Sequence, residues 1–361
     1  MKFSTTRVSS SELNEDNYVS TENMLQDFQG ILKAKSVPED VNVISFSCGD
    51  ILISNIRPYL KKVWKATFNG GCSSDVFVLQ ANDNIESDYL HYVVANDKFI
   101  NFVMSGAKGV KMPRGDKNQM KTYSLSLPQI QEQKKIGKML SLLDERITTQ
   151  NKIIEDLKKL KSAIIDYAIN SLNTDFAKFG SLYEMAGEGG TPTTSNASFY
   201  DNGKIPFIKI DDLKQKYLTE NKDFITELGL QKSSAWLVPT HSILFSNGAT
   251  IGEISITTYP VCTKQGILGI VPKQNIDVEF LYYFMSSSYF KKAVSRIVTE
   301  GTMKTAYLKD INNILCPIPT KEKQQEIAKM PSALNSKIDF EQSILKLFCS
   351  QKQYLLRQMF I

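Results

Sequence analysis

The chain has 361 residues, of which 42% are hydrophobic and 22% are charged, and its formal net charge at pH 7 is +5. These fractions are typical of a globular protein, and the length accommodates two domains that each bury a core. No apolar run approaches the roughly twenty residues of a membrane span, and the polar start lacks the apolar core of a signal peptide. We therefore expect a cytoplasmic protein, whose mild positive charge is compatible with nucleic acid as a partner.

The sequence lacks motifs for catalysis and metal binding. The five cysteines are scattered without a CxxC pair, and the only two histidines are His91 and His241. This pattern predicts neither a disulfide framework nor a zinc site, and it argues against histidine-based nucleophilic catalysis. A GxxxxGK[ST] loop, a GxGxxG turn and a GxSxG elbow are also missing. We expect no catalytic residues, no metal and no cofactor, which favours a binding protein over an enzyme.

The first 126 residues are predicted to form an α/β domain. Two strand-like apolar runs flank a Gly49-Asp50 turn, and Gly70-Gly71 is expected to form a turn before the next strand. The other expected elements are loops and short strands over 1–45, a strand over 76–80, a helix over 88–104, a loop rich in Gly and Lys over 105–121, and a strand-like segment over 123–128.

Residues 127–172 are predicted to form a long helix whose apolar residues recur every four and three positions. A repeat that averages 3.5 residues keeps one stripe facing a partner helix, as in coiled coils. About forty residues at ~1.5 Å each make a rod of roughly 60 Å. The predicted pairing seam contains Ile136, Leu140, Leu143, Ile147, Ile154, Leu157, Ile164 and Ala168, with polar interruptions at Gln150 and Lys161.

A second α/β domain is predicted over residues 173–317. It carries an early loop rich in Gly, Thr and Ser that includes Gly189–Pro192. The elements expected after this loop are strands over 204–210, 242–246 and 253–257, a helix over 280–298, a Gly/Lys loop over 299–310 and a strand within 313–319.

Residues 318–361 repeat the helical pattern 191 positions later without a gap. Pro128 corresponds to Pro319 and Gln133 corresponds to Gln324. Pro331 replaces Leu140, so the second helix is expected to kink or restart there. The second seam contains Ile327, Leu334, Ile338, Leu345, Phe348, Leu355 and Met359, with polar interruptions at Glu341 and Lys352.

Two matching helices in one chain are expected to pack against each other. Because each globular domain precedes its own helix, we expect an antiparallel pair with pseudo-twofold symmetry. The first domain has no recognisable counterpart of Gly189–Pro192. The repeat also relates segments of the domains: 49–54 with 242–246, 70–79 with 261–270, 89–93 with 280–284, and the loop 109–112 with 301–304.

Basic residues gather near turns and glycine loops of both domains, several of them beside aromatic residues. Lysine and arginine neutralise phosphates, while Arg, Asn, Gln and Thr at loop tips can read base edges. The candidate DNA-binding residues are Arg57, Lys61, Lys62, Lys65, Lys108, Lys111 and Arg114 in the first domain, and Thr191, Thr193, Thr194, Lys209, Asn247, Lys264 and Lys304 in the second.

The helical segments LPQIQEQKKIGKMLSLLDERI and IPTKEKQQEIAKMPSALNSKI, with GGTPTTSNASFY and PFIKIDDL in the second domain, resemble the specificity subunits of type I restriction-modification enzymes. The resemblance implies two target recognition domains (1–126 and 173–317) separated by two long antiparallel coiled-coil helices (127–172 and 318–361). Each domain would read one half of a split double-stranded DNA target.

The resemblance also implies partners. Two modification subunits would dock on the helical regions and methylate adenine with S-adenosylmethionine, and an ATP-dependent restriction subunit would translocate and cut DNA. The specificity subunit itself would not be catalytic. Two alternatives stay open: a coiled-coil adaptor that joins protein-binding domains without DNA, and a specificity module of a stand-alone methyltransferase system.

Overall fold

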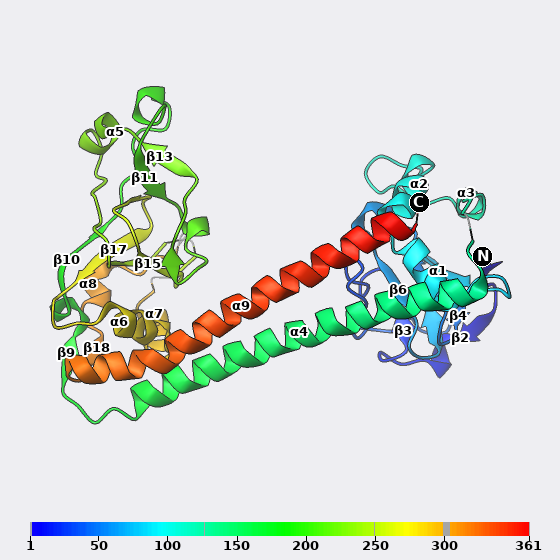
Figure 1. Cartoon of the computed structure of the whole chain (residues 1–361), viewed down its shortest axis with the longest axis horizontal. Helices are drawn as coiled ribbons and strands as arrows, with labels where there is room; N and C mark the ends of the chain where they lie inside the picture. The colour runs from blue at the N-terminus through cyan, green and yellow to red at the C-terminus, as the bar shows by residue number, and fades with distance from the viewer. Residues whose placement is uncertain (1, 126, 249, 299–303, 361) are drawn as a thin grey trace. The chain divides into compact units, whose positions relative to one another are not determined.

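The structure, a computed structural model, describes residues 2–125, 127–248, 250–298 and 304–360. The chain divides into two compact units, one formed by Met1–Asn151 with Ser343–Ile361 and the other by Lys152–Gln342 (Figure 1). The boundaries 152 and 343 are equivalent positions of the sequence repeat. Each unit therefore contains one predicted recognition domain together with the adjoining parts of both long helices. Within the described ranges, no helix is long and apolar enough to cross a membrane.

The first unit contains two four-stranded sheets and three short helices. One sheet has the antiparallel order β1-β8-β5-β6, and the other has the order β2-β4-β7-β3, in which β3 and β7 are parallel. The elements are β1 (Lys2–Phe3), β2 (Arg7–Ser9), β3 (Tyr18–Val19), β4 (Asn42–Phe46), β5 (Ile51–Ser54), β6 (Val63–Lys65), β7 (Gly70–Cys72), β8 (Val76–Gln80), α1 (Ser87–Val94), α2 (Asp97–Ser105) and α3 (Lys117–Lys121), with 3-10 turns η1 (Ser10–Glu12) and η2 (Pro58–Leu60).

The second unit is built on a five-stranded sheet of order β10-β17-β14-β15-β12, a three-stranded sheet β13-β11-β16 and the pair β18-β9. Its strands are β9 (Phe176–Lys178), β10 (Tyr183–Glu188), β11 (Ile205–Ile208), β12 (Tyr217–Leu218), β13 (Asp223–Ile225), β14 (Ile243–Ser246), β15 (Ile254–Thr257), β16 (Cys262–Thr263), β17 (Ile267–Pro272) and β18 (Leu315–Pro317). Its short helices are α5 (Glu227–Gln231), α6 (Val278–Ser286), α7 (Ser288–Ile297) and α8 (Leu308–Ile311), with 3-10 turns η3 (Phe179–Ser181), η4 (Ala197–Phe199) and η5 (Ile210–Asp212).

The main sheets of the two units correspond strand by strand, with β12 added at the edge of the second. Phe3 of β1 pairs with Leu79, and Ala186 of β10 pairs with Ile270, which is the repeat equivalent of Leu79. The segment after β1 therefore stands where Gly189–Pro192 stands in the second unit. The predicted opening has a structural counterpart in the first domain, but with a different sequence.

In both units, the helices that follow the sheet pack on one of its faces. In the first unit, Ile51 and Leu79 of the sheet share a core with Tyr89 of α1 and Phe99 of α2. The second unit builds the equivalent core from these residues: Ile243, Ile270, Phe280 and Phe290. Burial of these large apolar side chains is the main force that holds each sheet on its helices.

The predicted turn at Gly70-Gly71 is wrong, because both residues belong to β7. A Cβ atom on Gly70 would lie 2.1 Å from the carbonyl oxygen of Asn17, and one on Gly71 would lie 2.4 Å from Leu13 Cδ1. Glycine is required at this strand because neighbouring chain segments approach its backbone closely.

The single helices predicted over 88–104 and 280–298 are each two helices. Asn96 ends the first run and caps α2 by accepting a hydrogen bond from Lys98 N, and Ser287 does the same for α7 with Phe290 N. Positions 96 and 287 are repeat equivalents. A capping side chain ends one helix and starts the next, even where the apolar repeat of the sequence continues. The repeat alone therefore predicted one helix in place of two.

The strand predicted over 123–128 is also wrong, since its described residues lie outside any strand. The equivalent segment of the second unit does form a strand, β18, because β9 pairs with it in antiparallel fashion. A two- or three-residue strand depends on such a hydrogen-bonded partner rather than on its own propensity.

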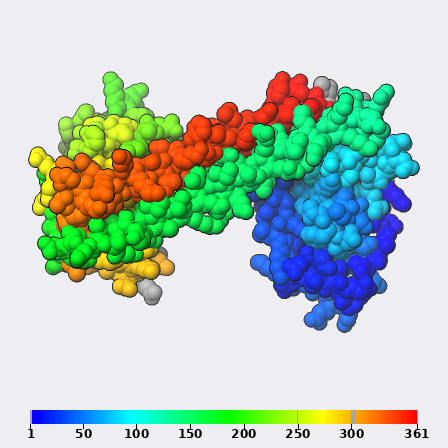
Figure 2. Space-filling view, turned by 60° about the horizontal axis from the view of Figure 1, so that its bottom comes forward, coloured from blue at the N-terminus to red at the C-terminus, as the bar shows by residue number. Residues whose placement is uncertain are grey.

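The long helices are α4 (Ile130–Asn170) and α9 (Lys321–Met359). The first unit pairs the early part of α4 with the late part of α9, as in the Asp144–Lys352 ion pair. The second unit pairs the late part of α4 with the early part of α9, where Lys161 Nζ donates to Asn335 Oδ1 at 2.9 Å. The helices are therefore antiparallel, and they lie side by side in Figure 2.

All predicted seam residues are buried or half-buried, as expected for side chains on the inner stripe of a helix pair. The predicted restart at Pro331 is wrong, since α9 continues through this buried residue. The prediction did not include a second set of contacts, which the long helices make with the domains. Ile165 and Ile169 pack into the core of the second domain, and Leu140 packs into that of the first.

Candidate nucleic-acid interface

An asparagine after the central strand of each unit joins two loops. Asn55 N donates to Asp75 O at 2.9 Å, and its carbonyl accepts from Gly115 N at 2.8 Å. In the second unit, Asn247 N donates to Gly266 O at 3.0 Å, and its carbonyl accepts from Ala306 N at 2.9 Å. We call the surface gathered around each of these residues the loop edge. It comprises 55–57, 73–75 and 108–115 in the first unit, and 189–194, 247–248, 264–266 and 304–306 in the second.

Four predicted residues meet at the first loop edge. Lys108 and Arg114 exchange backbone hydrogen bonds of 3.0 and 2.9 Å, which makes a small projecting loop with the exposed Lys111 at its tip. Arg57 N donates to Pro113 O at 2.7 Å and so joins this loop. Arg114 pairs with Asp75 at 3.2 Å. Arg57 and Lys111 have no ion-pair partner among the described residues.

The other three candidate DNA-binding residues of the first domain, all lysines, are held by contacts within the protein. Lys61 pairs with Asp97 in the first turn of α2 at 2.8 Å, and Lys65 pairs with Asp88 in the first turn of α1. Lys62 donates to the carbonyl of Thr21, and burial, followed by the neighbouring Arg57, lowers the pKa of its ammonium group. Lys61 and Lys65 thereby tie the strand β6 and the loop before it to helix starts, where acids are favourable.

The second loop edge gathers predicted residues from all four of its segments. Thr191 Oγ1 accepts from Gln265 N at 3.4 Å, next to the exposed Lys264. Thr193, Thr194 and Lys304 are also exposed. Lys209 lies close by, since its neighbour Ile208 accepts from Lys264 N, but its side chain pairs with Asp223 at 2.8 Å. The predicted counterparts of the first projecting loop at 301–303, Thr302 included, lie outside the described residues.

Two predicted features of this edge have structural roles. Asn247 is only 1% exposed, and its side-chain amide donates to Ala306 O at 3.2 Å. It therefore holds the segment 304–306 in place by a buried hydrogen bond. A Cβ atom on Gly189 would lie 2.3 Å from Thr263 O, and one on Gly190 would lie 2.3 Å from Ser234 Oγ. The glycines therefore let the opening segment pass between two other backbones.

Sequence reasoning missed Lys216, which is 5% exposed and lies just before β12. Its ammonium group pairs with Glu279 and donates to Tyr283 OH at 2.9 Å and to Ser332 Oγ at 3.0 Å. Burial acts to raise the pKa of Glu279, but hydrogen bonds from Lys216, Tyr217 and Ser332 outweigh it and hold the pKa below its ordinary 4.5. A basic run in a sequence gives no signal that one lysine is buried.

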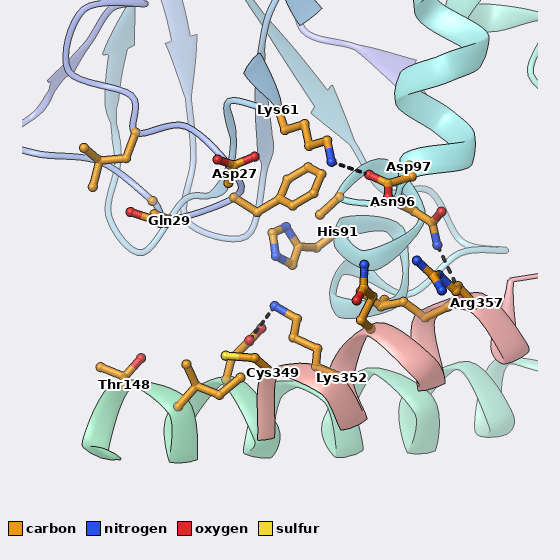
Figure 3. Close-up of a pocket in the computed structure, with 18 of the residues that line it drawn as sticks. Asp27, Gln29, Lys61, His91, Asn96, Asp97, Thr148, Cys349, Lys352 and Arg357 are labelled. Atoms are coloured by element: carbon orange, nitrogen blue, oxygen red, sulfur yellow. Dashed lines mark hydrogen bonds and ion pairs between the residues drawn. The ribbon is translucent and has the colours of Figure 1, made fainter. Parts of the chain in front are cut away.

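The first unit contains a cavity of about 1080 Å³ between the domain and the paired helices (Figure 3). Its charges are mostly paired: Lys61 with Asp97, and Lys352 with Asp144 at 2.5 Å. The His91 ring lies in its wall, and Nδ1 is enclosed without a hydrogen-bond partner among the residues that the structure describes. Burial, followed by Lys352, lowers the pKa of His91 from 6.5 to about 4, so this imidazole is neutral at pH 7.

Each unit thus carries a related α/β domain, packed on antiparallel helices, with exposed cations at one loop edge. This is the organisation of a protein with two recognition surfaces. A family model described as the type I restriction modification DNA specificity domain matches residues 5–159 and 173–347. The chain belongs to this family and is a DNA sequence-specificity subunit.

Similar proteins of known class are consistent with this assignment. The putative MjaX specificity subunit of Methanocaldococcus jannaschii is 27% identical over 331 residues, which cover 84% of this chain and 75% of the relative. The MjaVIII specificity subunit of the same organism is 26% identical, over 75% of this chain and 69% of the relative.

Two solved structures share the fold. One, from a type I R-M system studied for complex assembly and conformational transition, has a TM-score of 0.61 at 18% identity, covering 99% of this chain and 98% of that chain. The other, the S subunit from M. genitalium, has a TM-score of 0.59 at 17% identity, covering 99% of this chain and 96% of that chain.

Proposed function

We propose that the chain reads a bipartite double-stranded DNA target, one half with the loop edge of each unit, and that it has no catalytic activity of its own. The observation that carries this proposal is the loop edge, which recurs around Asn55 and Asn247 with equivalent backbone hydrogen bonds. A repeated edge with different side chains is suited to two different half-sites. Residues 1–126 and 173–317 are the proposed recognition domains.

Contacts at each edge divide by their chemistry. Arg57, Lys111, Lys264 and Lys304 are exposed cations that can neutralise phosphates or, for arginine, bind guanine through two hydrogen bonds. Thr193 and the adjacent Thr194 are exposed hydroxyl groups that can reach base edges. Four other lysines already have partners within their domains: Lys61, Lys62, Lys65 and Lys209. They would contribute to DNA binding through the positive electrostatic potential near the loop edge rather than by direct contact.

The long helices offer a surface for the modification subunits. In the second unit, Ile153, Leu160 and Tyr167 recur every seven residues on α4 and are exposed, as is Phe340 of α9. In the first unit, Leu142, Leu347 and Tyr354 are exposed on the same two helices. Apolar side chains that follow a heptad but face solvent are typical of a helix surface that a partner covers. We propose one modification subunit on each unit, joined by a restriction subunit.

Methylation mapping tests the proposal. A host that carries this chain with its modification subunit should methylate adenines within one split motif, and a host that lacks only this chain should not. Gel shifts with the purified chain, with and without the modification subunit, separate DNA reading from an adaptor role. Absence of a split motif, together with no DNA-dependent shift, would contradict the proposal and favour the adaptor.

A further inference from the structure

Two glutamines at repeat-equivalent positions make the same three hydrogen bonds. Gln133 Oε1 accepts from Glu86 N at 2.9 Å, and its Nε2 donates to Asn84 O at 3.0 Å and to Pro128 O at 2.9 Å. Gln133 lies in the first turns of α4 and is only 1% exposed. One side chain therefore joins three backbone groups in a site closed to water.

Gln324 in α9 repeats this arrangement in the second unit. Its Oε1 accepts from Asp277 N at 2.7 Å, and its Nε2 donates to Asn275 O at 3.2 Å and to Pro319 O at 2.9 Å. It is also 1% exposed. Each of the three hydrogen-bond partners of Gln324 lies 191 positions after the corresponding partner of Gln133. We call the two sets the glutamine clamps.

Each clamp links a recognition domain to its own long helix. Glu86 is the N-cap of α1, and its carboxylate accepts from Tyr89 N at 3.0 Å, so the clamped segment leads directly into the domain helix. Asp277 has the same role for α6, where it accepts from Phe280 N at 3.0 Å. The clamp therefore connects the start of a domain helix with the start of the helix that supports the domain.

A second contact lies one turn further along each long helix. A Cβ atom on Gly137 would lie 2.7 Å from Asp88 Cβ, so α4 and α1 touch closely there. Ala328, the equivalent residue of α9, is 4% exposed and packs in the core of the second unit. Two contact points along one helix restrict rotation of the domain against it, whereas one contact would act as a pivot.

We propose that Gln133 and Gln324 are positioning residues that fix the orientation of each recognition domain on its long helix and thereby restrict the spacing between the two DNA half-sites. This inference rests on the proposed bipartite reading of DNA. The glutamines lie in the helix starts and not at the loop edges, so they do not contact DNA. An amide is required because both its donor and its acceptor ends are used in a buried site.

The test compares clamp variants with matched controls on the same helix turns. The variants are Gln133→Leu and Gln324→Leu, which remove all three hydrogen bonds, and the milder Gln133→Met and Gln324→Met, which remove the same bonds with an unbranched side chain closer in shape to glutamine. The controls are Gln131→Leu and Gln325→Leu, which replace exposed glutamines. Faster hydrogen exchange of the Glu86 or Asp277 amide shows that a clamp has been released.

The readout is methylation by the complex with the modification subunit, on DNA in which the mapped half-sites are separated by gaps of varied length. Wild type and controls should prefer one gap. Each clamp variant should keep the half-sites, while its rate at gaps one base pair longer or shorter rises about tenfold relative to the preferred gap, as expected from loss of about 1.4 kcal/mol of restraint.

A folded clamp variant with the wild-type gap preference would overturn the inference, and so would a variant that changes the half-sites themselves. If a leucine variant fails to fold, the matching methionine variant decides by the same criteria. A wild type that methylates no split target would overturn the proposed function and this inference together, which distinguishes that failure from an unchanged gap preference.

Discussion

The two units use different lysines to hold an equivalent acid. Asp88 of α1 and Glu279 of α6 are repeat equivalents in the first turns of their helices. In the first unit the lysine is Lys65 at the end of β6, and the side chains are 29% and 35% exposed. In the second unit it is Lys216, just before the added strand β12, and the side chains are 2% and 23% exposed. The contact is maintained while the strand that supplies the lysine differs.

This difference shows which parts of the repeat are constrained. The glutamine clamps, the caps at Asn96 and Ser287 and the loop-edge asparagines occupy equivalent positions in both units. The edge strands and the side chains of the loops do not. Contacts that hold the domain on its helix are thus preserved, whereas the parts near the proposed DNA surface vary.

The largest expected effect is the loss of Lys216. Lys216→Met leaves Glu279 mostly buried without its cation, which should destabilise the second unit by about 3–5 kcal/mol. Lys65→Met in the first unit should cost at most about 1 kcal/mol, because that pair is partly exposed. Urea unfolding followed by hydrogen exchange in each unit measures both. Equal losses would show that the two pairs do not differ in burial as the structure indicates.

The second effect depends on pH and concerns His91, whose repeat equivalent is Tyr282. Between pH 6.5 and about 4 the unfolded imidazole binds a proton that the folded one does not, so the first unit loses stability as pH falls through this window. The total loss is about 3 kcal/mol and does not grow below pH 4. His91→Tyr should remove this dependence. Thermal unfolding between pH 4 and 7 checks it, with the exposed His241→Asn as a control that should retain it.

The third effect concerns DNA and separates the exposed cations from the engaged ones. Arg57→Ala and Lys111→Ala in the first unit, and Lys304→Ala in the second, should weaken binding. Those that contact only phosphate should reduce the slope of log affinity against log salt by about one each. Lys61→Ala should change the slope less, because its side chain pairs with Asp97. Filter binding over a salt series measures the slopes, and an unchanged slope in all of the exposed variants would contradict the loop edges as the DNA surface.

The smallest expected effect is on the stability of each unit when the acceptor of one polar contact between the long helices is changed. Lys352 pairs with Asp144 in the first unit, and its repeat equivalent Lys161 bonds to Asn335 in the second. Asp144→Asn should destabilise the first unit by about 1 kcal/mol or less, because a neutral acceptor still takes the hydrogen bond. Asn335→Asp should bring no comparable gain, because the new carboxylate strengthens the contact with Lys161 but loses the hydrogen bond that Asn335 Nδ2 donates to Asp339 Oδ2 at 3.1 Å. A change of several kcal/mol in either unfolding experiment would mean that these seam contacts are not equivalent.

The long helices and their pairing could be predicted because heptads are a local pattern that repeats. The strand over 76–80 matched β8 residue for residue, and 242–246 and 253–257 contained β14 and β15, because short apolar runs between turns are also local. The failures share a different cause. The described residues of the strand predicted at 123–128 have no paired strand beside them. The residues of the predicted Gly70-Gly71 turn belong to β7, which distant chain segments approach closely.

Local sequence patterns also could not assign roles within the candidate site. Lys216 and Asn247 are both polar residues beside turns, a position that favours exposure. Their burial depends on partners far along the chain: Glu279 and Ser332 for Lys216, and Ala306 for Asn247. The equivalence of Gln133 and Gln324 was readable from the sequence, but what each glutamine binds was not.

The division of the chain into units has a consequence for the order in which they are completed during synthesis. The second unit is one continuous segment, Lys152–Gln342, so all of its residues have been translated before the last part of α9 emerges. The first unit begins earlier but includes Ser343–Ile361, and the Phe360 ring lies 5.1 Å from that of Tyr89 in its core. The unit that the ribosome begins first is therefore completed after the other, and its apolar surface around Tyr89 stays partly uncovered until residues 343–360 have been made.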